Sequence, residues 1–266
     1  MLSYKQEENT KLKTTIIFNM NSILFFDVKI NPLPKSEFLD IIESSIKNGN
    51  RIVQNGLNAA AINLLVANKE LKNAYHHSDL INIDGMSIVW ALRLLGHKVP
   101  ERVTCPDLTD DILAMADKNN YSIFLLGAKE STLSLCRKNI QNNFPNLKIV
   151  GSQNGYYKEH EELAIIEKMK RANPDILLIG MPSPFKELFT EKYKHDLSIK
   201  YYLGVGGLFE VLAGEKKRAP KWMQNLGMEW FYRFAQEPSR LWKRYLIGNL
   251  KFVWLVFKEK KKIYEI

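Results

Sequence analysis

Asp84 is the carboxylate whose position most suggests chemistry. It ends the apolar run Leu80–Ile83, precedes Gly85 and opens a stretch of helical character. A carboxylate in that place is often only the N-cap of the following helix. Alternatively, a partly desolvated Asp at the mouth of a sheet has a raised pKa and acts as a general base toward a bound hydroxyl. The local sequence leaves both interpretations open.

Glycine-rich turns follow several other apolar runs. Gly127 follows Ser122–Leu126, and Gly204-Val205-Gly206-Gly207 follows the run that begins at Tyr201. Glycines at a strand-to-helix turn let backbone amides approach a phosphate, and the helix N-terminus adds favourable partial charge. These turns are compatible with a nucleotide diphosphate, but glycine is also the least strained residue for any tight turn of this kind.

Several common catalytic signatures are absent from the sequence. There is no early G-x-G-x-x-G fingerprint and no P-loop, which disfavours NAD enzymes and P-loop NTPases. The five histidines lack metal-ligand spacing, and no G-x-S-x-G elbow marks a serine hydrolase. Only two cysteines occur, Cys105 and Cys136, so neither a disulfide framework nor a four-cysteine zinc site is expected. Both cysteines are expected to be small buried apolar residues.

The net charge of +9 is concentrated at the C-terminal end of the 266 residues. Residues 215–266 contain 13 Lys or Arg against 5 Asp or Glu, and four of the five tryptophans. We therefore expect a nearly neutral body, 1–214, and a basic aromatic appendage, 215–266. The appendage suits an anionic partner such as nucleic acid, lipid headgroups or a phosphorylated substrate. A helical cap that packs its aromatic residues on the body is the alternative.

Hydrophobic residues make up 45% and charged residues 25% of the chain, which excludes a disordered, collagen-like or coiled-coil protein. No apolar run approaches the roughly 18 residues of a spanning helix. The start, Met1–Thr15, lacks the apolar stretch of a signal peptide. The chain is expected to be soluble and cytoplasmic.

Short apolar runs alternate with amphipathic stretches, which predicts an α/β fold: a mostly parallel sheet with helices on both faces. Ligands bind outside the carboxyl ends of such strands, so Asp84 and the glycine turns are expected at one edge. The expected strands are Ile16–Phe18, Phe25–Val28, Arg51–Val53, Leu80–Ile83, Ser122–Leu126, Lys148–Val150, Ile176–Ile179 and Tyr201–Val205. The expected helices are Ser36–Lys47, Met86–Leu95, Thr109–Lys118 with Thr109 as its N-cap, Ser131–Asn142 and Glu161–Arg171, with a short one ending near Gly214.

Three blocks from about residue 50 onward carry a further signal. The first contains Gly56-Leu57-Asn58, Asp84-Gly85, Arg93-Leu94-Leu95-Gly96 and Arg102-Val103-Thr104-Cys105-Pro106-Asp107-Leu108. The second contains Phe124-Leu125-Leu126-Gly127, Phe144-Pro145-Asn146-Leu147 and Asn154-Gly155-Tyr156-Tyr157. The third contains Pro174-Asp175-Ile176-Leu177, Gly204-Val205-Gly206-Gly207-Leu208-Phe209, Arg218-Ala219-Pro220, Gly227-Met228-Glu229-Trp230-Phe231-Tyr232-Arg233 and Glu237-Pro238-Ser239-Arg240. Together they resemble the WecG/TagA/CpsF glycosyltransferases, glycosyltransferase family 26.

This resemblance implies a bacterial enzyme that moves a sugar from a UDP-sugar to a lipid-diphosphate-linked sugar, with inversion of the anomeric configuration. Well-known members transfer N-acetylmannosamine or its uronic acid to N-acetylglucosamine-diphospho-undecaprenol, in teichoic acid or cell-surface polysaccharide synthesis. The implied fold is Rossmann-like, with an appendage that completes the active site at the inner face of the cytoplasmic membrane. The implied partners are a UDP-sugar, a polyprenyl-diphosphate-linked acceptor and an anionic membrane surface, without nucleic acid. Self-association into a homo-oligomer is left open.

The resemblance also assigns roles to single residues. Asp84 resembles the family's proposed catalytic base, and Asn58 the polar residue that faces it. The glycines Gly127, Gly204, Gly206 and Gly207 fall where UDP would be cradled. The arginines Arg218, Arg233, Arg240 and Arg244 resemble those thought to meet the diphosphates, for which a guanidinium offers bidentate pairing. No Asp-x-Asp motif occurs, so these arginines are expected to replace a metal ion, and no cofactor is expected.

Three positions depart from the family pattern. Gly56 stands where Thr is usual, Lys186 where Gln is usual, and Cys105 where many members have Gly. The first two changes leave the identity of the sugar open. Lys186 is expected either to bind a sugar carboxylate or the diphosphate, or to be a solvent-facing lysine at a helix start. The alternatives in function are a family member that uses another UDP-hexose or a UDP-uronic acid for exopolysaccharide, and a non-catalytic membrane- or nucleic-acid-binding protein.

Overall fold

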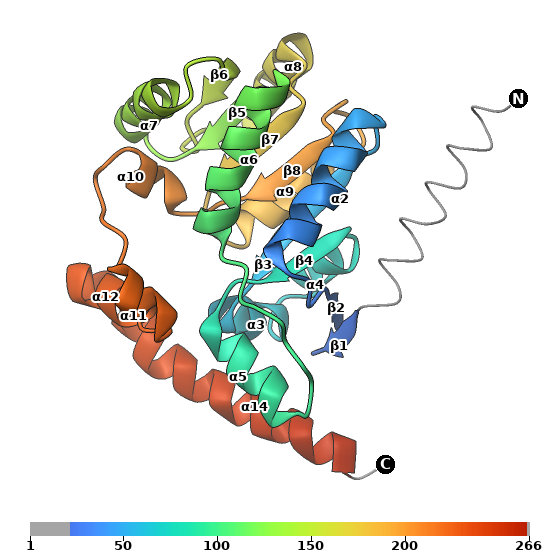
Figure 1. Ribbon diagram of the computed structural model, residues 1–266, viewed down its shortest axis with the longest axis vertical. Helices are drawn as coiled ribbons and strands as arrows, with labels where there is room; N and C mark the ends of the chain where they lie inside the picture. The colour runs from blue at the N-terminus through green and yellow to red at the C-terminus, as the bar shows by residue number, and fades with distance from the viewer. Residues whose placement is uncertain (1–21, 265–266) are drawn as a thin grey trace, which may run out of the picture.

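The computed structural model describes residues 22–264, so the expected strand Ile16–Phe18 lies outside the described residues. In the described part, six strands form a wholly parallel sheet, in the order β4-β3-β8-β7-β5-β6 (Figure 1). This arrangement confirms the expected α/β class. The strands are β3 (Ile52–Leu57), β4 (Leu80–Ile83), β5 (Ser122–Gly127), β6 (Lys148–Gln153), β7 (Ile176–Gly180) and β8 (Tyr201–Gly204).

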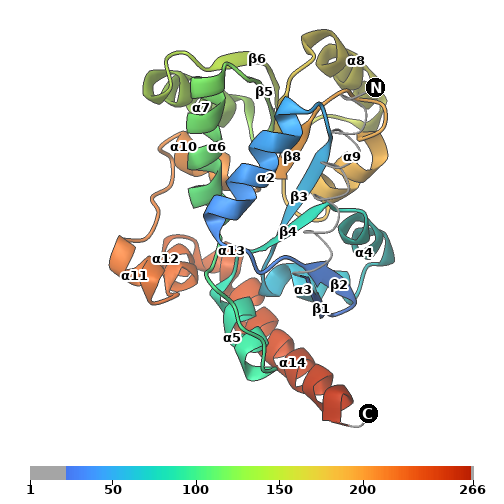
Figure 2. The same ribbon diagram turned by 45° about the vertical axis from the view of Figure 1, so that its right-hand side comes forward.

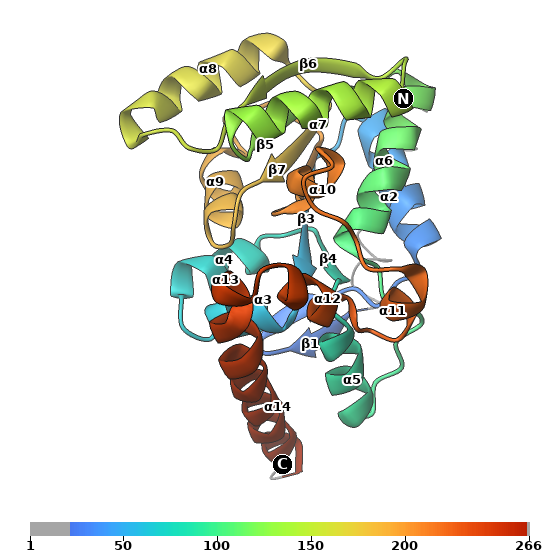
Figure 3. The same ribbon diagram turned by 90° about the vertical axis from the view of Figure 1, so that its left-hand side faces the viewer.

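Helices cover both faces of the sheet, so the strand residues are buried on both sides. Successive strand side chains point to opposite faces. Accordingly, Leu125 belongs to one core cluster, whereas Phe124 and Leu126 belong to another. The first cluster packs under α2 (Lys35–Lys47), α6 (Cys105–Asn119), α7 (Glu130–Asn143) and α10 (Leu208–Leu212), and the second under α8 (Glu162–Ala172) and α9 (Phe185–Tyr193). Figure 3 shows α2 and α6 on one side of the sheet and α9 on the other.

A third core lies beside β4. It is built from the hairpin β1 (Ile23–Phe25) and β2 (Val28–Ile30), with α3 (Ala59–Leu65), α4 (Lys69–His76), α5 (Met86–Leu94) and α14 (Gly248–Tyr264). Phe252, Leu255 and Val256 of α14 are among its buried residues. The last helix of the appendage is therefore part of the body's hydrophobic core, and it crosses the molecule beside α3 (Figure 2).

Two expectations about local structure were wrong. The run Phe25–Val28 is not one strand but the turn of the β1–β2 hairpin, where Phe26 and Asp27 adopt positive φ angles of 51° and 61°. Two such residues make the turn whose twist matches paired strands. The N-cap of α6 is Thr104, not Thr109: Oγ1 of Thr104 accepts from the Asp107 amide at 3.2 Å. Proline near the first position, Pro106, is preorganised for a helix start.

After Pro220 the described part of the appendage consists of helices, interrupted by a turn at residues 226–228 and by a bend at Glu237. A π-helical turn, η2 (Lys243–Ile247), joins α13 (Pro238–Trp242) to α14, and such turns occur frequently at functional sites. No helix among residues 22–264 is both long and apolar enough to cross a membrane. The elements that precede α14 are α11 (Lys221–Asn225), α12 (Glu229–Gln236), α13 (Pro238–Trp242) and the π turn η2 (Lys243–Ile247).

Candidate active site

A cleft of about 1800 Å³ opens at the carboxyl ends of the strands, between the sheet and the appendage. A pocket for one drug-sized ligand measures about 300–1,000 Å³, so this cleft has room for a large substrate or for two. Ten of the eleven residues expected at the site line it. They are Asn58, Asp84, Lys186, Gly204, Gly206, Gly207, Arg218, Arg233, Arg240 and Arg244.

The Asp84 carboxylate follows β4 and is held by two donors. The Cys105 amide donates to Oδ1 at 2.8 Å, and the Asn58 side chain donates to Oδ2 at 3.2 Å. The N-cap of the next helix, α5, is Gly85, without a side-chain cap bond. The N-cap interpretation of Asp84 is therefore wrong for that helix. Instead, the carboxylate meets the first amide of α6, where the helix dipole favours negative charge.

Asn58 makes both of its side-chain contacts within the site. Its Oδ1 accepts from the Ala61 amide at 3.1 Å and so caps α3, while its Nδ2 donates to Asp84. The cap fixes the direction of the amide group, because Asn58 cannot turn without leaving the helix end unsatisfied. The arrangement explains why an asparagine after β3 orients a carboxylate after β4.

The glycine turns pack closely, and three of their backbone amides donate to carbonyl groups at the end of β7. Gly127 is buried outside the cleft lining, with φ at 130°, and a Cβ there would lie 2.5 Å from the Gly180 carbonyl carbon. The Ala128 amide donates to Gly180, and those of Val205 and Gly206 donate to Ile179. In this conformation these three amides serve the strand ends. A role of the glycines in cradling UDP stays a prediction.

Lys186 is buried rather than exposed to solvent, so the expectation of a solvent-facing lysine was wrong. Lys186 is 8% exposed, and its ammonium pairs with the neighbouring Glu187. The stem passes over Gly204, where a Cβ would lie 2.8 Å from Cδ of Lys186. The glycine after β8 thus makes room for a lysine from α9.

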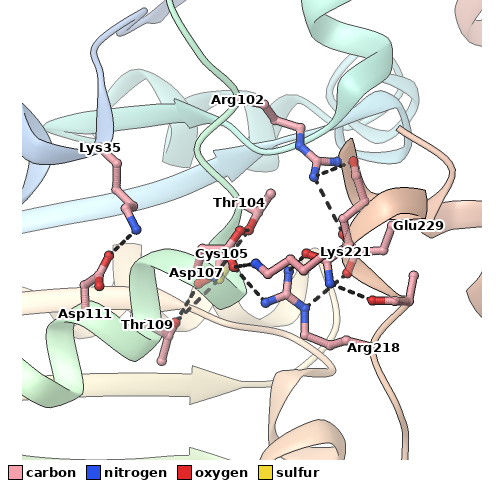
Figure 4. A network of polar contacts seen from close by, with 12 residues as sticks. Lys35, Arg102, Thr104, Cys105, Asp107, Thr109, Asp111, Arg218, Lys221 and Glu229 are labelled. Carbon is pink, nitrogen blue, oxygen red and sulfur yellow. Dashed lines mark hydrogen bonds and ion pairs between the residues drawn. The ribbon is translucent and has the colours of Figure 1, made fainter. Parts of the chain in front are cut away.

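Arg218 anchors the appendage to the body (Figure 4). Its guanidinium donates to Asp107 Oδ1 at 2.8 Å, to Gln224 Oε1 at 3.1 Å and to Glu229 Oε1 at 3.3 Å. Burial favours a raised pKa for the Asp107 carboxyl, but hydrogen bonds from Arg218 and Thr104 outweigh it and hold the pKa at about 2. Each of the three nitrogens of the Arg218 guanidinium thus has a protein partner.

Arg240 is also paired in the free protein. It donates to Oε2 of Glu237. The other carboxylate oxygen of Glu237, Oε1, pairs with Lys216 at 3.0 Å. Lys216 in turn pairs with Glu210. This chain of ion pairs joins the segment after α10 to the start of α13.

Arg233 and Arg244 differ from the other two arginines, because no carboxylate in the described part of the chain pairs with either guanidinium. Nη2 of Arg233 lies 3.5 Å from where a Cβ on Gly207 would stand, so it covers the glycine-rich turn. Arg244 lines the cleft. Desolvation lowers the pKa of Arg244, the charges of Arg233 and Arg240 lower it further, and Tyr245 and Asp84 oppose them. Guanidinium groups remain charged in proteins. Two charged guanidinium groups without carboxylate partners thus face the cleft.

Cys136 is buried, as expected, whereas Cys105 is only partly buried and lines the cleft. Burial, with the Asp84 charge, raises the pKa of the Cys105 thiol to about 12, and burial alone does the same for Cys136. Neither is a thiolate at neutral pH, so neither is a nucleophile. Among residues 22–264 no cluster of three or more His, Cys, Asp or Glu side chains has the arrangement of a metal site.

Sequence reasoning missed the partners of the expected residues. The Cys105 amide, which holds Asp84, is a backbone group and carries no side-chain signature. Glu187, Asp107 and Glu229 are the counter-ions of Lys186 and Arg218. Thr104-x-x-Asp107 followed by an apolar periodic stretch was the available signal for the start of α6.

Comparison with known proteins identifies the family of the chain. The profile of the glycosyl transferase WecG/TagA/CpsF family matches residues 23–265. A relative from Bacillus subtilis (strain 168), N-acetylglucosaminyldiphosphoundecaprenol N-acetyl-beta-D-mannosaminyltransferase, is 35% identical over 184 residues, which span 69% of this chain and 70% of that protein. The protein is thus a glycosyltransferase. It belongs to the WecG/TagA/CpsF family, as the sequence resemblance indicated.

Proposed function

We propose that this chain transfers an N-acetylmannosamine-type sugar from a UDP-sugar to an acceptor sugar linked to a polyprenyl diphosphate. The Bacillus relative is named for the transfer of N-acetylmannosamine to N-acetylglucosaminyldiphosphoundecaprenol. The observation that carries the proposal is that one cleft contains both an oriented carboxylate, Asp84, and two cations without carboxylate partners, Arg233 and Arg244.

In this mechanism Asp84 takes the proton from the acceptor hydroxyl. The oxygen then forms a bond to the anomeric carbon of the donor sugar as the bond from that carbon to the UDP oxygen breaks. A single displacement of this kind inverts the anomeric configuration. Holding base, hydroxyl and anomeric carbon in one geometry supplies much of the rate enhancement, because the entropy of alignment has already been lost on binding.

The leaving UDP carries away negative charge that develops during the reaction. Arg233 and Arg244 present fixed guanidinium groups to that charge, and such preorganised cations stabilise a transition state more than mobile water does. We propose that these two arginines meet the diphosphate without a resident metal ion, whereas Arg218 and Arg240 hold the appendage in place through their carboxylate partners.

The lipid part of the acceptor has an apolar path to the base. The cleft lining continues from Asp84 along α5 and α14 to Trp90, Leu94, Val253 and Phe257, all of which are exposed. In all three views of the ribbon α5 and α14 extend away from the sheet on the same side (Figures 1–3). An apolar groove that reaches a catalytic carboxylate suits an acceptor with a hydrocarbon tail.

The outer face of α14 suits a membrane surface. Leu250 and Trp254, four residues apart, are exposed outside the cleft lining, Val253 and Phe257 are exposed beside them, and Phe252 packs inward. Lys258 lies over the Trp254 ring, 5.5 Å from its centroid. Aromatic residues with lysines beside them are typical of helices that lie in an anionic bilayer interface. We propose that the protein acts while bound to such a surface, on the inner face of the cytoplasmic membrane.

A donor screen tests the proposal. The full chain is incubated with a short-chain polyprenyl-diphospho-N-acetylglucosamine and with UDP-N-acetylmannosamine, UDP-N-acetylglucosamine or UDP-glucose. The expected result is a disaccharide lipid from UDP-N-acetylmannosamine, and UDP should raise the melting temperature. Absence of any product from every donor, with no shift on UDP addition, would overturn the proposal.

A further inference from the structure

The last part of the appendage is one helical run that contains a π turn. α13, η2 and α14 follow one another without a break from Pro238 to Tyr264, and α14 packs beside α3 (Figure 3). In η2 the Gly248 amide donates to the carbonyl of Lys243, five residues back, where an α-helix has a step of four. The turn therefore takes up one more residue than an α-helical turn does.

The extra residue decides where Arg244 faces. Arg244 stands eight residues before Phe252, whose side chain packs into the core beside β4. In an uninterrupted α-helix, eight steps of about 100° would leave the two side chains about 80° apart. Because the π turn takes up one residue more, Arg244 lies closer to the helix face of Phe252, and both residues line the cleft. Relaxation of the turn to α-helical geometry would rotate the guanidinium away from that face.

Asn63 of α3 holds the end of this turn. Its Nδ2 donates to the Gly248 carbonyl at 2.7 Å, and a Cβ on Gly248 would stand 3.4 Å from the same nitrogen. Gly248 thus closes the π turn with its amide and receives the asparagine on its carbonyl. The contact joins the body to the appendage at the residue where the register of the helix changes.

The stability of α3 does not account for an asparagine at this position. In the part of the chain that the structure describes, Oδ1 of Asn63 is buried without a hydrogen-bond partner, and such an oxygen is destabilising. Asparagine is also a poor residue inside a helix. An apolar side chain of the same size would avoid both penalties. The feature that requires the carboxamide is its hydrogen bond to the π turn.

The same helix also orients the base. Asn58 caps α3 and donates to Asp84, and Asn63 follows five residues later. One element of the body therefore holds the carboxylate through its first residue and the π turn through its flank. A base and a cation that are fixed to one rigid element keep their relative geometry, which alignment of two substrates requires.

We propose that Asn63 is a positioning residue for sugar transfer: by holding the π turn at Gly248 it orients Arg244 toward the cleft. This inference rests on the proposed function, in which Arg244 meets the diphosphate of UDP, and adds to it the residue that directs this cation. Asn63 acts through Arg244 and is not a catalytic residue.

The test is Asn63→Leu, which keeps the size of the side chain and removes the donor. The affinity for UDP, measured by calorimetric titration, should fall by about three- to tenfold, the effect of one hydrogen bond. The melting temperature without ligand should change by only a few degrees, because Phe252, Leu255 and Val256 still hold α14 in the core. Asn63→Gln keeps a donor on a longer, flexible stem and should recover part of the affinity.

Double variants show whether Asn63 acts through Arg244. In the Arg244→Ala background, Asn63→Leu should have little further effect on the affinity for UDP, since the cation that it directs is gone. The matched background is Arg233→Ala, in which Asn63→Leu should weaken UDP binding by the same factor as in the wild type. An equal further loss in both backgrounds would overturn the inference.

Two other results would also overturn it while transfer itself persists. One is an unchanged affinity for UDP in Asn63→Leu. The other is a melting temperature lowered by about 10 °C or more in that variant, which would assign Asn63 to the attachment of α14 alone. If Arg244→Ala itself binds UDP like the wild type, the role of Arg244 in the proposed function is wrong, and this inference with it.

Discussion

The side-chain nitrogen of Asn58 lies 3.2 Å from Oδ2 of Asp84, while its side-chain oxygen caps helix α3. One residue therefore couples the start of a helix to the orientation of a carboxylate that follows a different strand. The second donor to Asp84, the Cys105 amide, comes from the start of another helix, α6. The direction of the carboxylate is thus set by two helix N-termini.

Substitutions at Asn58 separate its cap on α3 from its contact with Asp84. Asn58→Asp keeps an oxygen for the α3 cap but places a second negative charge beside Asp84. Asn58→Ala removes both contacts. We expect both variants to transfer sugar slowly, but only Asn58→Ala to lose cap stability, about 1 kcal/mol. Urea denaturation and turnover at saturating donor measure the two effects. Full activity in Asn58→Asp would show that the asparagine serves the cap alone.

Asp84 itself is tested by Asp84→Asn. The amide oxygen can still accept from the Cys105 amide, so the fold and UDP binding should persist. Turnover should fall by roughly 10²–10⁴-fold, the usual loss for a general base. The melting shift caused by UDP serves as the control for binding. Near-normal turnover in this variant would assign Asp84 a purely structural role at the start of α6.

The Arg218–Asp107 pair predicts a pH dependence of stability. The pKa of Asp107 is about 2 in the folded protein, against about 3.9 when unfolded. A lowered pKa contributes stability that is fully present above about pH 4 and is lost as pH falls through the folded pKa. Arg218→Ala should therefore destabilise the protein most near neutral pH, and the difference from the wild type should shrink from pH 4 downward. Urea titrations between pH 7 and 3 measure this. A difference independent of pH would contradict it.

Membrane binding is assigned to one face of α14. Trp254→Glu and Leu250→Glu alter side chains that are 61% and 74% exposed, so the melting temperature should change little. Sedimentation with vesicles rich in anionic lipid should drop sharply, because a charge replaces an apolar group at the interface. Leu163→Glu, on α8 and 71% exposed, is the matched control that should keep vesicle binding. Equal loss in all three variants would rule out a specific face.

The parallel sheet could be predicted because each of its strands contains a short apolar run, although β3 and β6 continue beyond these runs through polar residues. The hairpin at Phe26 and Asp27 could not, since neither residue is the glycine or asparagine that such turns usually contain. Spacing along the sequence also could not show that Phe252 faces the core. The period of a helix indicates which residues share a face, but α14 has an apolar face toward α3 and another toward solvent.

The charged residues of the site were identified more readily than their partners. Residue type and position in the family pattern predicted Arg218 and Arg233 as site residues on the same grounds. In the free protein, however, only Arg218 of these two is paired with carboxylates. That difference depends on Asp107, which is 111 residues away in sequence. Tertiary pairing of this kind has no local signature, so sequence alone did not separate the anchoring arginines from the unpaired ones.

The division among the arginines leads to a further prediction. Arg233→Ala and Arg244→Ala remove cations without carboxylate partners, so the fold should persist and mutual repulsion near Arg244 should even decrease. The affinity for UDP should fall, because charge-assisted hydrogen bonds to a diphosphate are lost. Arg233→Lys should restore only part of it, since an ammonium lacks the bidentate fork.

Arg218→Ala is the matched control. It breaks the contacts with Asp107, Gln224 and Glu229, so it should lower the melting temperature of the free protein far more than Arg233→Ala does. Calorimetric titration with UDP and thermal melts without ligand give the two readings for each variant. The expected pattern is crossed: weak UDP binding with normal stability for Arg233→Ala and Arg244→Ala, and reduced stability for Arg218→Ala. If Arg233→Ala binds UDP like the wild type and Arg218→Ala melts like it, the roles assigned to these arginines are wrong.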